Sequence, residues 1–144
     1  MSKPATDVRF LSHDDALVIH EDSLLMYGGR IGLPHPVNLE SALAAPMQLD
    51  HYESSTLPER ERIALLAAAY WVHLALAHAF ADGNKRVAFS SGILFLYTNG
   101  YDIAMTEDEG YELAIRIAER RVDRAEVAAW IAPRLTPLDP ASDL

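Results

Sequence analysis

An uncharged run of 19 residues, from Ile63 to Ala81, restricts most strongly how this chain can fold. The run approaches the length of a membrane-spanning helix. Its most frequent residue is alanine, which is only weakly hydrophobic, and it also contains His73 and His78. The sequence has no second run of this kind, and a polar motif follows directly. Because a helix that is apolar on all sides must be buried, we expect a central helix with the rest of the chain packed around it, and no membrane span.

Helix start signals recur along the chain, each of them a capping side chain followed three residues later by an acid. The four pairs are Ser12 with Asp15, Thr56 with Glu59, Thr106 with Glu109, and Asp123 with Glu126. They predict helices from Ser12 to Gly28-Gly29, from Thr56 through Pro58 to about Ala79, from Thr106 to Arg120-Arg121, and from Asp123 to Pro133. Two more are expected, from Asn38 to about Ala45 and from Asn84 to Thr98. Since no run alternates as a strand would, the fold class is all-α, with about six helices.

The remaining segments lack a clear helical pattern. Residues Met47 to Ser55 are predicted to form a loop or a short hairpin. The tail from Thr136 contains proline and aspartate and is expected to fray. At 144 residues, the chain is expected to be a single domain over 1–144 with a core from about 8 to 135, long enough to bury a hydrophobic interior.

Charge and cysteine content exclude several functions. The formal net charge is −9, which works against a general DNA or RNA binder because such a protein needs a basic face for phosphates. The chain has no cysteine, which excludes disulfides, thiolate metal sites and a cysteine nucleophile, and fits a cytoplasmic protein. The first seven residues lack the cationic start and apolar core of a secretion signal. We therefore expect a cytoplasmic protein that contacts neither membrane nor nucleic acid.

The central run ends in a polar motif, residues 78–86, which reads His-Ala-Phe-Ala-Asp-Gly-Asn-Lys-Arg. His78 lies at the predicted C-terminal end of the helix, where an imidazole can accept a proton from a substrate at neutral pH. His73 is five residues away and about 140° around the helix, so the two cannot chelate one metal ion and His73 is expected to be structural. Phe80 is expected to be a core anchor that fixes the loop.

The residues after Phe80 fit a site for phosphates. Lys85 and Arg86 are in a predicted first helical turn, where cations oppose the helix dipole unless an anion is bound. Asp82 can hold Mg²⁺, which binds through one or two carboxylates plus substrate phosphates. Gly83 allows positive φ or a close backbone approach. Asn84 could instead be a simple N-cap, and Asp82 a turn carboxylate. Together the groups suit transfer of part of a nucleotide to a hydroxyl.

These residues resemble the signature of the Fic/Doc (Fido) superfamily, which usually reads His-x-Phe-x-Asp/Glu-Gly-Asn-Gly-Arg-x-x-Arg. Lys85, in place of a glycine, is typical of the death-on-curing (Doc) branch. The resemblance extends from the first helix, which ends in Tyr27-Gly28-Gly29, through the long helix that enters the motif, to Leu94-Phe95-Leu96 and Asn99-Gly100 after it; about 120 of the 144 residues fit. It implies the helical Fic/Doc fold with a short irregular flap near Leu49 to Ser55.

The resemblance also implies roles for the motif. His78 would be the base that deprotonates a hydroxyl of a protein target, and Asp82 would bind Mg²⁺. The nucleotide phosphates would be bound by Gly83, Asn84, Lys85, Arg86 and Ser90. Fic enzymes generally transfer AMP from ATP, whereas Doc proteins transfer the γ-phosphate, inactivating elongation factor Tu and arresting translation.

Three departures from the Fic pattern bear on this choice. Phe89 stands at the position of the second arginine of the signature, so one phosphate-binding side chain is absent, which weakens the AMP-transfer interpretation. Ser90 stands where Doc members can carry asparagine. The chain has no Ser/Thr-x-x-x-Glu-Gly/Asn segment, the inhibitory pattern of many Fic proteins, so control by a separate antitoxin protein is expected. The hypothesis is a Doc-like toxin and ATP-dependent protein kinase; the alternatives are an adenylyltransferase and a catalytically inactive regulatory protein of the same fold.

Overall fold

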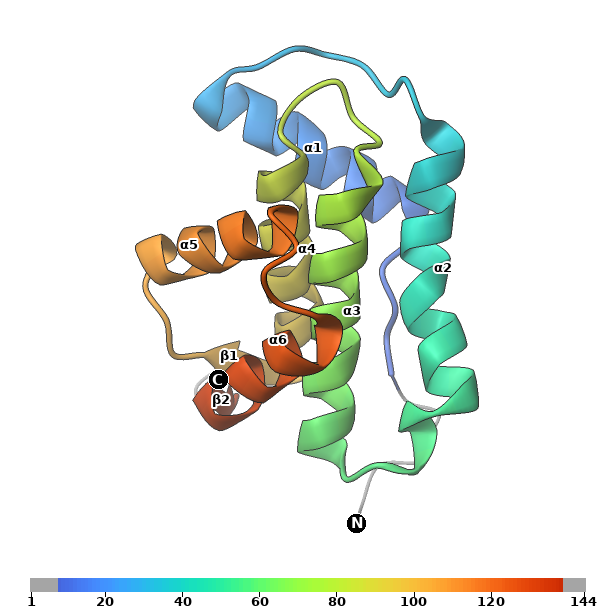
Figure 1. Cartoon of the computed structure of the whole chain (residues 1–144), viewed down its shortest axis with the longest axis vertical. Helices are drawn as coiled ribbons and strands as arrows, with labels where there is room; N and C mark the ends of the chain where they lie inside the picture. Colours follow the sequence, from blue (N-terminus) through green and yellow to red (C-terminus); the bar gives the residue numbers. More distant parts are fainter. Residues whose placement is uncertain (1–7, 139–144) are drawn as a thin grey trace, which may run out of the picture.

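The computed structural model describes residues 8–138 and shows six α-helices with a small ribbon of two strands (Figure 1). The helices are α1 (His13–Tyr27), α2 (Pro36–Tyr52), α3 (Glu59–Ala77), α4 (Asn84–Thr98), α5 (Glu107–Ala118) and α6 (Arg124–Ile131). Strands β1 (Tyr101–Ile103) and β2 (Leu135–Pro137) pair antiparallel, and single 3-10 turns cover Ser54–Thr56 and Ala132–Arg134. The mostly helical fold predicted from the sequence is confirmed.

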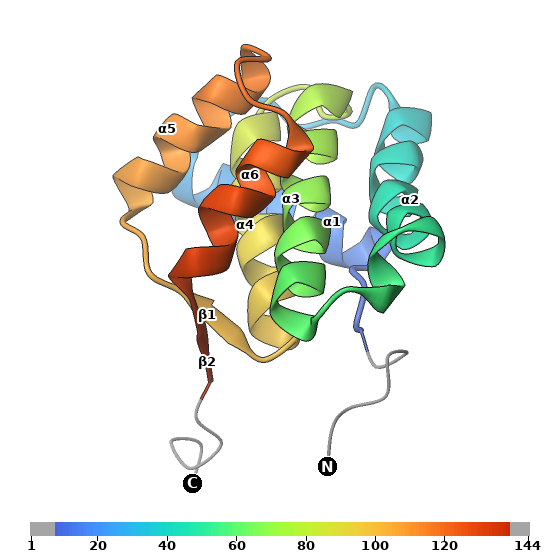
Figure 2. The same cartoon turned by 60° about the horizontal axis from the view of Figure 1, so that its bottom comes forward.

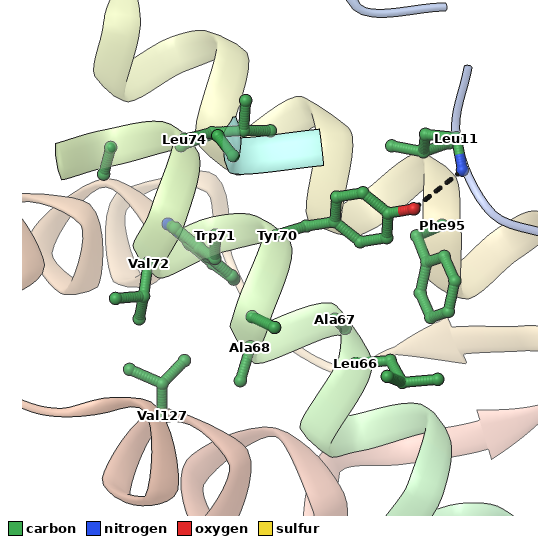
Figure 3. Close-up of a cluster of buried hydrophobic side chains, with 14 of the residues drawn as sticks. Leu11, Leu66, Ala67, Ala68, Tyr70, Trp71, Val72, Leu74, Phe95 and Val127 are labelled. Carbon is green, nitrogen blue, oxygen red and sulfur yellow. Dashed lines mark hydrogen bonds between the residues drawn. The ribbon is translucent and has the colours of Figure 1, made fainter. Parts of the chain in front are cut away.

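Helix α3 is the centre of the molecule, as the uncharged run predicts. It packs against α2 on one side and against α5 and α6 on the other, with α4 alongside (Figures 1 and 2). Tyr70 and Trp71 are fully buried in the middle of the helix. The Tyr70 hydroxyl accepts a 2.8 Å hydrogen bond from the backbone N–H of Leu11, which ties the segment before α1 to the core (Figure 3). Burial, more than any other cause, raises the pKa of Tyr70 to about 12.

Within residues 8–138, no helix is long and apolar enough to cross a membrane. The uncharged run is instead covered by other helices. Its alanines allow close packing, and Gly92 of α4 lies directly against the Trp71 ring, where an added Cβ would be only 3.4 Å from a ring carbon. The prediction of a buried central helix is therefore confirmed.

Three of the four predicted helix starts are capping boxes in the structure. Ser12, Thr106 and Asp123 each accept a hydrogen bond from the backbone N–H three residues later, and the acid at that position bonds back to the cap. The fourth prediction is wrong. Thr56 belongs to a 3-10 turn, and α3 starts after Pro58, which has extended backbone and makes no side-chain cap.

The prediction of irregular structure from Met47 to Ser55 is also wrong. Helix α2 begins at Pro36, two residues earlier than expected, and continues through the buried Pro46 to Tyr52. Its last turns are held by an ion pair, in which the Asp50 carboxylate accepts two hydrogen bonds from Arg62 of α3, 2.8 and 2.6 Å long. A buried bidentate pair of this kind can hold a helix past a proline that lacks one backbone donor.

The first residues of the C-terminal segment form regular structure that the sequence does not predict. Thr136 and Pro137, expected to fray, pair with Asp102 and Tyr101 in the two-stranded ribbon. Strands of three residues are too short to show an alternating pattern, which explains why the sequence does not predict them. The rest of the predicted tail, from residue 139, and the N-terminal residues 1–7 lie outside the described residues.

Candidate active site

The predicted motif forms a loop between α3 and α4, at one end of the helical core (Figure 1). Helix α3 ends at Ala77, two residues before the predicted end, because His78 adopts a left-handed conformation with φ 49° and ψ 41°. Histidine is among the few residue types that adopt this region with some frequency. The turn reverses the chain and leaves the His78 side chain exposed beside the start of α4.

The loop is held by the segment that joins α1 to α2. The backbone N–H of His35 donates to the carbonyl of Ala79 at 3.1 Å, and the N–H of Ala81 donates to the carbonyl of Gly32 at 3.0 Å. The guanidinium of Arg30 donates to the Ala81 carbonyl at 2.9 Å. These bonds satisfy backbone groups that a loop would otherwise have to leave to water. The loop is thus fixed by a neighbouring piece of chain about fifty residues away in sequence.

The segment next to the site is therefore residues 28–35, and the flap expected near Leu49 to Ser55 is misplaced. Leu49 to Tyr52 are helical, and Ser54 and Ser55 lie in a 3-10 turn. That region adjoins the first residue of α3, whereas the motif follows its last residue. A helix of 19 residues spans about 28 Å, so the two regions lie at opposite ends of the core (Figure 1).

Asn84 fastens the loop from within. Its side-chain oxygen accepts a 3.0 Å hydrogen bond from the backbone N–H of Phe80, and its side-chain nitrogen donates a 3.0 Å bond to the Phe80 carbonyl. Phe80 is buried, as expected of a core anchor. The N-cap of α4 is Gly83, at φ 80°, and Asn84 is the first helical residue. Both ends of the Asn84 side chain are thus bonded to Phe80, and only the backbone N–H of Asn84, in the first turn of α4, is left to bind a ligand.

Asp82 carries the exposed carboxylate of the loop. One oxygen accepts a 3.0 Å hydrogen bond from the backbone N–H of Gly83, and the other accepts a longer one, 3.3 Å, from the backbone N–H of Arg30. Gly29 approaches so closely that a Cβ there would be 3.1 Å from the Asp82 carboxylate. Residues 8–138 contain no group of three or more His, Cys, Asp or Glu side chains that could hold a metal ion. A single carboxylate fits Mg²⁺ that takes its other ligands from phosphates and water.

A cavity of about 320 Å³ brings together six of the seven predicted site residues. Its walls contain His78, Asp82, Gly83, Asn84, Lys85 and Arg86, joined by Ala75, Ala81 and Tyr111. The first backbone N–H groups of α4 have no acceptor within the helix and point toward this end. In the described residues, neither Lys85 nor Arg86 forms an ion pair with an acid. The cavity therefore combines an imidazole, a carboxylate and free cationic donors.

Arg86 lies at the border between this cavity and a second one. Its guanidinium carbon is 4.1 Å from the centre of the Tyr27 ring, a cation–π contact. The Tyr27 hydroxyl donates a 3.0 Å hydrogen bond to Glu107, and this bond raises the pKa of Tyr27. The second cavity, about 480 Å³, lies between α1, α4 and α5 and shares Arg86 and Tyr111 with the first.

Ser90 lines this second cavity and is not part of the first. Ser90 therefore shares a cavity with Arg86 but not with the other five motif residues. Phe89 packs at 5.3 Å edge-on to Trp71 and lies against Gly110 of α5, where an added Cβ would be only 2.1 Å from the Phe89 ring. The position of the second Fic arginine is thus filled by a side chain that joins α3, α4 and α5.

His73, expected to be structural, points away from the motif cavity. Arg124 of α6 donates to its Nε2 atom at 3.3 Å, and burial followed by the charge of Arg124 lowers the pKa of His73. No sequence pattern assigns Arg30, His35 or Tyr111 to the site. They contact or line it through the fold, and no local pattern marks them.

The structure as a whole is that of a small helical protein whose central helix ends in a loop lined by an imidazole, a carboxylate and two cationic side chains. The sequence profile of the Fic/DOC family matches residues 10–96, more than half of the chain. The chain belongs to the Fic/Doc family. It is similar to the protein kinase doc of Escherichia phage P1, with 28% identity over 121 residues, 84% of this chain and 91% of that protein. It is also similar to the toxin Doc of Mycolicibacterium smegmatis, with 31% identity over 125 residues, 85% of this chain and 91% of that protein.

Proposed function

We propose that this protein is a Doc-like toxin that transfers the γ-phosphate of ATP to a hydroxyl group of a protein. The observation that carries the proposal is the cavity in which His78, Asp82, Lys85 and Arg86 lie together at the start of α4. Similarity to a protein kinase and to a toxin of the same family over most of both chains supports it. Catalysis of this kind depends mainly on positioning and on stabilising charge, which the loop and helix end supply.

His78 accepts the proton of the attacking hydroxyl. The hydroxyl oxygen forms a bond to the γ-phosphorus, the bond from that phosphorus to the β–γ bridging oxygen breaks, and ADP leaves with the electron pair. The exposed ring of His78 is open to an incoming protein chain. Its left-handed backbone is held by the hydrogen bonds of the two following loop residues, so the ring stays at the rim of the cavity.

The phosphates bind to the N-terminal end of α4. The backbone N–H groups of Asn84 and Lys85, the Lys85 ammonium and the Arg86 guanidinium supply donors and positive charge, while Gly83 lets the chain approach the phosphates closely. Asp82 would hold Mg²⁺, which offsets negative charge on the phosphates when bound. Ser90, in the adjoining cavity, would contact a part of the nucleotide beyond the phosphates that touch Lys85.

Two features favour γ-phosphate transfer over AMP transfer. Lys85 lines the cavity with a bulky cation where the Fic signature has glycine, and this fills space needed by an α-phosphate. Phe89 cannot bind phosphate and packs instead against Trp71. The target we propose is elongation factor Tu, and its modification would arrest translation in the cytoplasm. A separate antitoxin protein would bind the toxin and neutralise it.

Labelled ATP tests the reaction. The protein is incubated with purified elongation factor Tu and ATP labelled at either the α- or the γ-phosphate. We expect transfer of the γ-label only, and its loss in the variant His78→Ala. His13→Ala, at an exposed position at the start of α1, is the matched control and should retain full transfer. Transfer of the α-label alone would show an adenylyltransferase, and growth arrest by His78→Ala equal to that of the wild type would show a toxin that acts by binding.

A further inference from the structure

A buried histidine of α1 contacts two residues of the active-site loop. His20 is 7% exposed, and its Nε2 atom lies 2.9 Å from the carbonyl oxygen of Asp82. A carbonyl oxygen only accepts hydrogen bonds, so Nε2 must carry the proton. The imidazole also stacks on Phe80, with ring centres 3.9 Å apart and an angle of 18° between the planes. One side chain thus holds the loop at two residues.

The hydrogen bond from His20 fixes the orientation of the Asp82–Gly83 peptide group. In a trans peptide, the carbonyl and the N–H point in opposite directions. With the Asp82 carbonyl directed to His20, the Gly83 N–H points away from His20, where it donates to the Asp82 carboxylate at 3.0 Å. Through this peptide group, a residue 62 positions earlier in the chain positions one oxygen of the carboxylate, while the other oxygen accepts the 3.3 Å bond from the Arg30 N–H.

No other described side chain makes this contact. The imidazole lies over Gly83, where an added Cβ would be in van der Waals contact with the ring at 3.8 Å. Ser23, one turn further along α1, is also buried, but a Cβ on Gly83 would be 3.9 Å from its hydroxyl, and no hydrogen bond joins it to the loop. Within the described residues, His20 alone donates to the Asp82 carbonyl.

We propose that His20 is a positioning residue that orients the Asp82 carboxylate for the metal ion of the metal–nucleotide complex. The proposal rests on the proposed function, in which Asp82 binds Mg²⁺. His20 does not touch the reacting atoms. It acts through the peptide group, in the way that hydrogen-bond partners of metal ligands generally orient those ligands.

Two substitutions separate the hydrogen bond from the ring stack. His20→Phe keeps a flat ring against Phe80 but has no donor. His20→Gln loses the ring but places an amide N–H at the distance of Nε2. His13→Phe, at the exposed start of α1, is the matched control. Urea unfolding of each variant reports any change in stability, and binding of Mn²⁺ with a non-hydrolysable ATP analogue, followed by electron paramagnetic resonance, reports the metal site.

We expect His20→Phe to weaken Mn²⁺ binding about tenfold, the lower end of the effect of such partners. His20→Gln should restore binding, and none of the variants should change the affinity for the analogue without metal. Equal Mn²⁺ affinity of His20→Phe and the wild type overturns the proposal. So does a Gln variant as weak as the Phe variant, because the ring and not the donor would then matter.

A measurement on the wild-type protein decides the case even if His20→Phe does not fold. The ¹⁵N NMR signals of the His20 ring should show the proton on Nε2, with a change in the ring signals when Mg²⁺ and the analogue are added. A proton on Nδ1 alone overturns the proposal. If Asp82→Asn binds Mn²⁺ as tightly as the wild type, the metal role of Asp82 fails, and that outcome separates an error in the proposed function from an error about His20.

Discussion

The role of Asn84 can be tested by removing its side chain. The structure shows this side chain bonded at both ends to the backbone of Phe80, with each bond 3.0 Å long. Asn84→Ala leaves the Phe80 N–H and carbonyl without partners in a partly buried place. An unpaired buried polar group costs about 1–3 kcal/mol, and partial access to water favours the low end. The expected loss in the free energy of unfolding is therefore about 2 kcal/mol in total, and the melting temperature should fall by roughly 6–10 °C.

Asn84→Asp provides the matched comparison. It keeps the acceptor for the Phe80 N–H and places a negative charge in the first turn of α4, which the helix dipole favours. Its loss of stability should be about half that of Asn84→Ala. Its affinity for ATP should fall more, because a carboxylate now lies among the phosphate donors. Urea unfolding and isothermal titration with ATP measure the two effects. An Asn84→Ala protein of unchanged stability that binds ATP poorly would refute the reasoning, since the amide would then contact the nucleotide directly.

Further substitutions test the buried ion pair, the contact between Phe89 and Gly110, and the backbone of Gly83. Arg62→Met leaves the buried Asp50 carboxylate without its cationic partner and should lower the free energy of unfolding by about 3–5 kcal/mol, as measured by urea unfolding. The hydrogen bond from Arg62 lowers the pKa of Asp50, so the pair stabilises the folded wild type at pH values above the ordinary carboxyl pKa, near 4. This contribution is lost as the pH falls below that value. Asp50→Asn should not lose stability in this way, and free energies of unfolding that depend on pH identically in the two proteins would contradict the prediction. Gly110→Ala should cost about 1–3 kcal/mol through a clash with Phe89 and should be rescued by Phe89→Leu; destabilisation that persists in the double variant argues against the clash. Gly83→Ala should cost about 1–2 kcal/mol from backbone strain at φ 80°, as measured by thermal unfolding, and a neutral effect would show that the loop can rearrange.

Most of the helical frame can be predicted from local signals. Three capping boxes mark the starts of α1, α5 and α6, because the capping bonds join residues only three apart. The start of α3 and the end of α2 were not predictable in this way. Thr56 has the same spacing to an acid but lies in a 3-10 turn, and α2 continues past Pro46 to a turn in which Asp50 pairs with Arg62 of another helix. Local patterns do not contain such tertiary contacts.

The site shows the same division. The sequence identifies the motif residues, because they are contiguous and chemically unusual. It cannot identify Arg30 or His35, which reach the loop from the segment between α1 and α2. These contacts are made to backbone carbonyl groups of the loop, and His35 also uses its own backbone N–H. Backbone groups are the same in every residue type, so no sequence pattern marks them. The misplaced flap has a related cause: an extended segment with few apolar residues looks like any other connector until its hydrogen-bond partners are known.

The motif itself contains two kinds of residue, and they differ in what they say about activity. Phe80, Gly83 and Asn84 build the loop: one is buried, one has a left-handed backbone, and one has a fully engaged side chain. His78 and Asp82 are exposed; the His78 ring makes no hydrogen bond to the described residues, and the Asp82 carboxylate accepts two from backbone N–H groups. A match to the loop-building residues therefore supports the fold, because any protein with this turn needs them. The exposed His78 ring has no such structural role, so tests of catalysis rest most directly on substitutions of His78, and not on the motif as a whole.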